Sequence, residues 1–319
     1  MPLDQPTRQS EAAATIAKLG IGDLYPFAHN FVETPQGAMH YIDEGRGDPV
    51  LCLHGNPTWS FLWREFVAGL SRHHRVVAPD HIGFGLSAKP EDEAAYTVEA
   101  HVRNLEALVL DLDLRNVTLV MQDWGGPIGL AVAARHPRRI KALVVLNTFG
   151  FYPLHPSMKA DGLRLPPPLL LMRSKPLGTW LVRKKGMFDG FVTKIATADS
   201  ERLRAVHHAY RDVFGGPEGR GGVMAFPRLI PTHTSHPVAR MLMEETGPFL
   251  DAFEGPAQIY WGMKDPLFPP LALEGWKSRL PRAEVIELPK AKHYLQEDAP
   301  EIIVPGIARF LERIAEKGV

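Results

Sequence analysis

Residues 117–126 read Val-Thr-Leu-Val-Met-Gln-Asp-Trp-Gly-Gly, an apolar run followed by a polar pair, a tryptophan and two glycines. A short, β-branched apolar run without alternation is typical of a strand buried on both faces of a parallel sheet. Asp123 follows that run, and Gly125 and Gly126 permit a tight turn into a helix. This is the layout of a nucleophile elbow, where a serine between glycines usually lies. The sequence therefore predicts Asp123 as a carboxylate nucleophile, with a simple helix N-cap as the alternative.

Comparable apolar runs lie on both sides of this stretch and predict the other strands of a sheet. They are Met39–Ile42, Val50–Leu53, Arg75–Ala78, Ala142–Leu146, Ala257–Trp261 and Ala283–Leu288. Helical spacing of apolar residues between the runs, clearest over Thr97–Leu112, predicts helices that alternate with the strands. The pattern favours an α/β fold with a mostly parallel central sheet and helices on both faces.

The alternation stops after residue 147. Residues 148–235 are rich in Pro, Arg, Lys and Gly and contain helical pieces but no clear strand, so we interpret them as an inserted helical cap. We expect a core made of residues 29–147 and 236–319. Residues 1–28 are expected to form an N-terminal extension that begins with a helix.

Composition narrows the class of partner. The 36 Lys and Arg residues balance 36 Asp and Glu residues, so nothing calls for nucleic acid or a membrane surface as partner. A small uncharged substrate suits a neutral chain better. Cys52 is the single cysteine and cannot form an internal disulfide. No signal peptide or membrane span of ~18–20 apolar residues is evident, so we expect a cytoplasmic protein. His233 and His236 lack a nearby third metal ligand, and we expect neither metal nor cofactor.

Polar residues follow three further predicted strands. His54-Gly55-Asn56-Pro57 follows the Val50 strand, Asp265 follows Trp261, and His293 follows the last strand. In a parallel sheet the carboxyl ends of the strands meet at one edge, where functional groups collect. The order Asp123, Asp265, His293 is that of nucleophile, acid and histidine in the fold with the elbow. We therefore predict these three residues as the catalytic set.

The motifs together resemble the haloalkane dehalogenases of the α/β-hydrolase superfamily. The resemblance is carried by His54-Gly-Asn-Pro-Thr-Trp, Pro79-Asp-His-Ile-Gly-Phe-Gly-Leu-Ser87 and Gln122-Asp-Trp-Gly-Gly-Pro127. It implies attack of Asp123 on the carbon that bears the halogen, with Asn56 and Trp124 as halide donors. His293 would then activate water, assisted by Asp265. An earlier acid position of the family holds Asn147 here, so the set resembles the third dehalogenase subfamily, which is said to favour large assemblies.

Other functions remain open at this stage. The same residues resemble the β-lactone decarboxylases of olefin biosynthesis, which share the Asp-His-Asp set and the Asn-Trp pair. An epoxide hydrolase would need two cap tyrosines, for which Tyr152 and Tyr210 are the candidates. A receptor on the same fold would bind ligand without turnover. Trp180 is expected to pack within the cap, with a second halide contact as the alternative.

Overall fold

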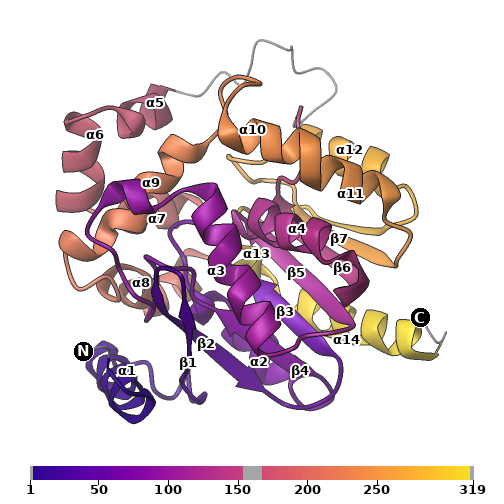
Figure 1. The fold of residues 1–319 in the computed structure, drawn as a ribbon, viewed down its shortest axis with the longest axis horizontal. Coiled ribbons are helices and arrows are strands. Elements are labelled where there is room, and N and C mark those ends of the chain that lie inside the picture. Colours follow the sequence, from indigo (N-terminus) through magenta and orange to yellow (C-terminus); the bar gives the residue numbers. More distant parts are fainter. Residues whose placement is uncertain (1–2, 154–166, 317–319) are drawn as a thin grey trace.

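The computed structural model of the protein describes residues 3–153 and 167–316. An eight-stranded sheet lies at its centre, in the order β1-β2-β4-β3-β5-β6-β7-β8 (Figure 1). The strands are β1 (Asn30–Thr34), β2 (Gly37–Glu44), β3 (Pro49–Leu53), β4 (Arg75–Pro79), β5 (Val117–Asp123), β6 (Ile140–Thr148), β7 (Ala257–Gly262) and β8 (Glu284–Leu288). The predicted α/β class with a mostly parallel sheet is thus confirmed.

The strands from β4 to β8 along the sheet pair in parallel, whereas β1 with β2 and β2 with β4 pair antiparallel. Every predicted run forms a strand. β1 was not among the predicted strands. It lies at the edge of the sheet, and Val32 is its only buried residue. A strand with so little buried surface has a weak apolar pattern, because patterning reflects burial.

Helices cover both faces of the sheet, as predicted (Figure 1). α3 (Val98–Asp111) packs beside α4 (Gly125–Arg135) on one face, and α2 (Arg64–Leu70) packs beside α14 (Pro300–Glu316) on the other. The helical spacing of α3 buries Val102, Leu105 and Leu108. Its first turn is capped by Thr97, whose side chain accepts from the Ala100 N–H. α12 (Pro270–Arg279) and α13 (Leu295–Asp298) complete the sheet region.

Between β6 and β7 the described residues form helices and the loops that join them, and no strand. In order these are α5 (Pro167–Arg173), α6 (Leu177–Thr179), η4 (Trp180–Lys184), η5 (Met187–Val192), α7 (Thr193–Ile195), α8 (Ser200–Asp212), η6 (Glu218–Arg220), α9 (Gly221–Leu229), α10 (Pro237–Met241), η7 (Leu242–Thr246) and α11 (Gly247–Ala252). η7 and α11 pack against α4. The division into extension, core and cap at residues 28, 147 and 235 stays a prediction.

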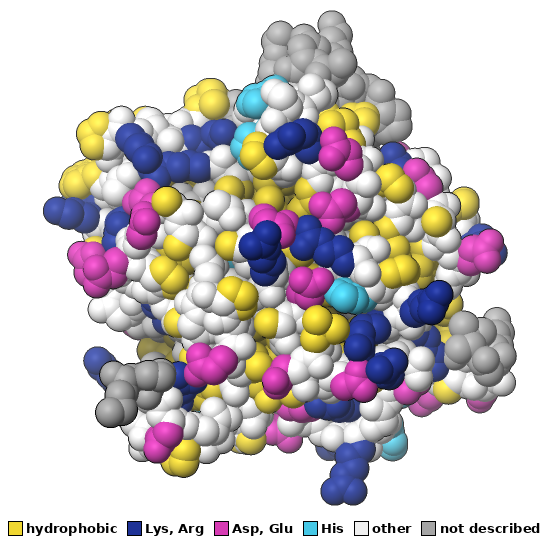
Figure 2. Space-filling view, viewed as in Figure 1, with side chains coloured by type: hydrophobic (Ala, Val, Ile, Leu, Met, Phe, Trp, Pro, Cys, Tyr) yellow, Lys and Arg dark blue, Asp and Glu magenta, His cyan; other side chains and the backbone are white. Residues whose placement is uncertain are grey.

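The N-terminal α1 (Gln5–Leu19) packs onto β1 and α8 and buries Ala12 and Ile16. Ala12 and Ile16 therefore pack inside the protein and are not available as a contact surface. On the face drawn in Figure 2, basic and acidic side chains are intermixed, in keeping with the balanced composition. Within residues 3–153 and 167–316, no helix combines the length and apolar character that a membrane crossing requires.

Candidate active site

The predicted elbow forms at the end of β5. Asp123 is the last residue of the strand, and its backbone has φ of 49°, in the left-handed region. Few side chains adopt this conformation, and such residues cluster at active sites. The turn needs both following glycines: a Cβ on Gly125 would lie 2.2 Å from the Leu53 carbonyl oxygen, and one on Gly126 would lie 2.0 Å from Thr148 Oγ1. The backbone therefore presents Asp123 at a fixed point above the sheet.

The structure brings the three predicted catalytic side chains together in a buried site. His293 Nδ1 lies 2.8 Å from Asp265 Oδ2, a hydrogen bond. His293 Nε2 lies 3.6 Å from Asp123 Oδ2, beyond direct hydrogen-bond reach but close enough for one water to serve both. Asp265 Oδ1 accepts from the Leu267 N–H at 2.7 Å, which fixes the carboxylate. The arrangement has the geometry of a nucleophile, a base and a group that orients the base.

Asn56 approaches the nucleophile from the loop after β3. Its backbone N–H donates to Asp123 Oδ1 at 2.8 Å. The approach requires Gly55, because a Cβ there would lie 2.1 Å from Asp123 Oδ1. The backbone N–H of Trp124 also donates to the Asp123 carboxyl group. Two backbone donors therefore converge on the Asp123 carboxyl group, as the donors of an oxyanion hole do.

Burial sets the charge balance of the site. Desolvation raises the pKa of Asp123, although His293 and the two backbone N–H donors oppose the rise. Burial alone would lower the pKa of His293, but the carboxylates of Asp265 and Asp123 outweigh it, so the pKa of His293 is raised. A more basic carboxylate and a more basic imidazole favour nucleophilic attack and proton abstraction, respectively.

The two predicted halide donors lie beside Asp123. The Trp124 ring is held edge-on between Phe149 and Phe226, each with ring centroids 5.0 Å away. Within the described part of the chain, the Asn56 side-chain amide Nδ2 reaches only the Val223 carbonyl oxygen, at the long distance of 3.5 Å. A donor in so weak a bond remains available to a stronger acceptor.

The contacts of several side chains around the site could not be predicted from the sequence. Phe226 comes from α9, and Phe268 stacks on the His293 ring with centroids 5.6 Å apart. No spacing links these residues to the elbow, so only the tertiary fold places them. Gln122, inside the quoted motif, contacts His293 through its side chain. Asn147, noted in the sequence as a non-acidic position, donates to Asp265.

Other residues singled out in the sequence lie elsewhere. Trp180 is 46% exposed and carries Lys185 over its ring, so it is not packed inside the cap as predicted. The Tyr210 hydroxyl donates to the Glu297 carboxylate, which disfavours a role in opening an epoxide. Tyr152 is buried. Among the described residues, no group of His, Cys, Asp or Glu is arranged to hold a metal ion.

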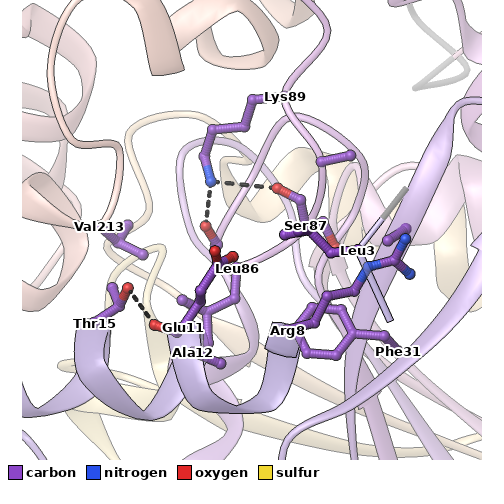
Figure 3. Close-up of a pocket in the computed structure, with 13 residues that line it drawn as sticks. Leu3, Arg8, Glu11, Ala12, Thr15, Phe31, Leu86, Ser87, Lys89 and Val213 are labelled. Carbon is purple, nitrogen blue, oxygen red and sulfur yellow. Dashed lines mark hydrogen bonds between the residues drawn. The ribbon is translucent and has the colours of Figure 1, made fainter. Parts of the chain in front are cut away.

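A surface pocket of about 280 Å³ lies apart from these side chains (Figure 3). Arg8 and Glu11 of α1 line one side, and Ser87 and Lys89 line the other. Lys89 donates to the carbonyl oxygens of Gly85 and Ser87, and burial lowers its pKa to about 8. Because those bonds tie down the loop after β4, Lys89 serves the fold, and the pocket contains none of the predicted site residues.

Comparison with known proteins agrees with this geometry. Residues 48–300 match the family model described as alpha/beta hydrolase fold. The chain is 35% identical to a cis-3-alkyl-4-alkyloxetan-2-one decarboxylase of Shewanella oneidensis, over 90% of this chain and 89% of that protein. It is 36% identical to haloalkane dehalogenase 2 of Mycobacterium bovis, over 89% of this chain and 95% of that protein.

The solved structures similar to the chain include a tetrameric haloalkane dehalogenase, DpaA from Paraglaciecola agarilytica. It superposes with a TM-score of 0.76 at 28% identity, covering 92% of this chain and 96% of that one. Similarity of this extent covers the sheet and the insertion between β6 and β7 together.

Proposed function

The chain belongs to the α/β-hydrolase family, and we propose that it is a haloalkane dehalogenase, an enzyme that converts a haloalkane and water into an alcohol and a halide. One observation carries the proposal. The Asp123 carboxyl group accepts from the backbone N–H groups of Asn56 and Trp124, and its Oδ2 faces His293. The dehalogenase relatives and structural neighbours support the same activity.

In the first step Oδ2 of Asp123 attacks the halogen-bearing carbon of the substrate. A carbon–oxygen bond forms, the carbon–halogen bond breaks, and its electron pair leaves with the halide. No proton needs to be removed, because a carboxylate is the attacking group. The Asn56 amide and the Trp124 indole are neutral N–H donors, which stabilise developing negative charge without competing as nucleophiles.

In the second step water attacks the Asp123 carboxyl carbon of the alkyl ester. His293 Nε2 takes a proton from that water, and the backbone N–H groups of Asn56 and Trp124 stabilise the oxyanion. Collapse breaks the acyl–oxygen bond, and the alkoxide takes the proton from His293 to leave as alcohol. The Asp123 carboxylic acid then releases the second proton of the water to solvent, which restores the carboxylate. Asp265 holds the imidazole in the right tautomer and stabilises the imidazolium.

A second candidate is decarboxylation of an oxetan-2-one, a four-membered lactone. The observation that favours it is the name of the Shewanella relative, which is as similar to the chain as the dehalogenase is. Asp123 would open the lactone ring, and loss of CO2 would give an alkene. The same nucleophile serves both reactions, so the substrate separates them.

Halide release from 1-bromoalkanes and 1-iodoalkanes of graded length tests the proposal, with Asp123→Asn as the control. We expect release by the wild-type protein and background release by the variant. The same preparations are given a cis-3,4-dialkyl oxetan-2-one, and alkene is measured. Alkene without halide would replace the dehalogenase proposal by the decarboxylase. Binding without turnover of either class would indicate a receptor.

We further propose a homo-oligomer, supported by the tetrameric dehalogenase among the structural neighbours. Light scattering at several protein concentrations tests this. A single protomer mass at every concentration would contradict it. The substrate expected for the site is a small apolar molecule, because Phe149 and Phe226 pack against Trp124, the residue after the nucleophile.

A further inference from the structure

The amide of Gln122 contacts Nε2 of His293, the ring nitrogen that must receive the proton from water. Gln122 precedes the nucleophile on β5 and is buried. Its Nε2 lies 2.9 Å from His293 Nε2 and 3.2 Å from the His293 carbonyl oxygen. Its Oε1 has no hydrogen-bond partner among the described residues. Gln122 thus meets the catalytic base through one end of its amide only.

These contacts fix the orientation of the amide. An exchange of its two ends would set Oε1 against the carbonyl oxygen of His293, where neither atom carries a proton. In the observed orientation the two protons on Nε2 serve the two neighbours, one each. His293 Nε2 must then be an acceptor, and Nδ1 carries the ring proton that is donated to Asp265.

We propose that Gln122 is a positioning residue that holds His293 neutral, with Nε2 as an acceptor, until the hydrolytic water takes its place. Asp265 fixes the tautomer from one side of the ring, and Gln122 fixes it from the other. The displacement of Gln122 by the hydrolytic water rests on the function proposed above. The neutral state of His293 in the free protein is independent of that function.

Protonation of His293 Nε2 would set its new N–H against the N–H of Gln122. The amide must then turn or move away, so the observed contact opposes the imidazolium. The charged groups that face His293 are Asp265 after β7, Asp123 on β5 and Asp298 on α13, and all three favour the imidazolium. Among these neighbours Gln122 is the opposing contact, which keeps the base ready to accept a proton.

Gln122→Leu tests the role, because it removes the donor and keeps an apolar chain of similar length. The measurement is the tautomer and pKa of His293 by NMR of the ¹⁵N-labelled imidazoles, with His293→Gln to identify the signal. We expect the pKa of His293 to rise by roughly 0.5 to 1, the effect of losing one hydrogen bond to the neutral form. An unchanged pKa and tautomer would overturn the proposal.

Gln258→Leu is the matched control. Gln258 is also buried in a strand, donates through Nε2 to Glu284, and has an Oε1 without a partner among the described residues. Gln258→Leu removes the same amide group as Gln122→Leu, but away from His293. An equal shift in both variants would mean that the change is general, and would also overturn the proposal.

A third variant covers the case in which Gln122→Leu does not fold. Gln122→Glu keeps the shape and sets a carboxylate beside Nε2, so we expect the pKa of His293 to rise by roughly 1 to 3. No rise would contradict the assigned contact. For Gln122→Leu, the acid limb of the pH profile of ester hydrolysis should move with the pKa of His293. The halide burst of that variant should change less than ester hydrolysis, since halide release needs no proton transfer. Absence of any halide would count against the proposed function, and the NMR result would still decide the role of Gln122.

Discussion

Asn147 Nδ2 lies 2.7 Å from Asp265 Oδ2, the oxygen that also accepts from His293. Asn147 is itself held at both ends of its amide, since Nδ2 also donates to the Gly262 carbonyl and Oδ1 accepts from the Gly262 N–H. The backbone of β7 therefore sets the position of Asn147, and Asn147 sets that of Asp265. Asp265, the proposed acid, is thus anchored through Asn147 by the strand beside it.

Replacing Asn147 with leucine should lower kcat by roughly 10- to 100-fold, the size of effect seen when an outer partner of an active-site group is lost. The carboxylate of Asp265 would lose a donor and its fixed orientation toward His293. Asn104→Leu is the control, because Asn104 is equally buried but bonds to Gln36. Steady-state kinetics measure kcat for both variants, and thermal unfolding measures how far each variant is destabilised. An equal loss of kcat in the control would remove the special role of Asn147.

Gly55→Ala should displace the oxyanion loop. The new methyl group would lie 2.1 Å from Asp123 Oδ1, so the Asn56 N–H must move away from that oxygen. We expect a loss of roughly 10²- to 10³-fold in the rate of ester hydrolysis, which is typical when one oxyanion donor is removed. Gly22→Ala is the matched control, with nothing within 4 Å of its new Cβ. Single-turnover kinetics give the rate, and wild-type hydrolysis in Gly55→Ala would contradict the assignment.

Glu297 ties α8 to the sheet region. Its fully buried carboxylate accepts from Arg64 Nη1 and Nη2 at 2.6 and 2.8 Å and from the Tyr210 hydroxyl. Glu297→Ala would remove the bidentate partner of the buried Arg64 guanidinium and leave it the more exposed Glu65 carboxylate, 3.9 Å from Nε. We expect a cost of about 3–5 kcal/mol in the free energy of unfolding. Chemical denaturation measures this change.

The exposed pair of Glu274 and Lys277 offers the comparison. Glu274→Ala should change the free energy of unfolding by less than about 1 kcal/mol, because solvent screens surface ion pairs. A similar small change for Glu297→Ala would show that the buried network contributes little to stability.

The protein should lose stability as the pH falls below 6.5. Burial lowers the pKa of His54 to about 4 and that of His101 to about 3, from an ordinary value of 6.5. In the unfolded chain both protonate near 6.5, whereas in the fold they stay neutral, so protons favour unfolding. Their contribution is complete above pH 6.5 and declines as the pH falls from 6.5 toward 4.

Urea unfolding at a series of pH values between 7.5 and 4.5 tests this. His101→Phe should show a shallower decline, because one buried neutral imidazole is removed. His293, whose pKa is raised, has the opposite dependence but is present in both proteins. Identical declines for the two proteins would contradict the account of His101.

The sheet and the proximity of the three predicted catalytic residues could be predicted from the sequence for a physical reason. Buried parallel strands have distinct apolar runs, and the topology alone brings their ends, with Asp123, Asp265 and His293, to one edge. The edge strand β1 lacked that pattern. The contacts of Gln122 and Asn147 depend on which way each side chain points from its strand end, and the position of Phe226 depends on how α9 folds over the sheet. Such relationships follow from tertiary packing and leave no spacing in the sequence.

The proposed mechanism requires that Asp123 is alkylated during turnover. His293→Gln should permit the first step and block the second, so a bromoalkane should release about one halide per protein. Intact-protein mass spectrometry should then show a gain of one alkyl group, and peptide mapping should assign it to Asp123. Halide release without an adduct, or an alkyl group on another residue, would contradict the mechanism.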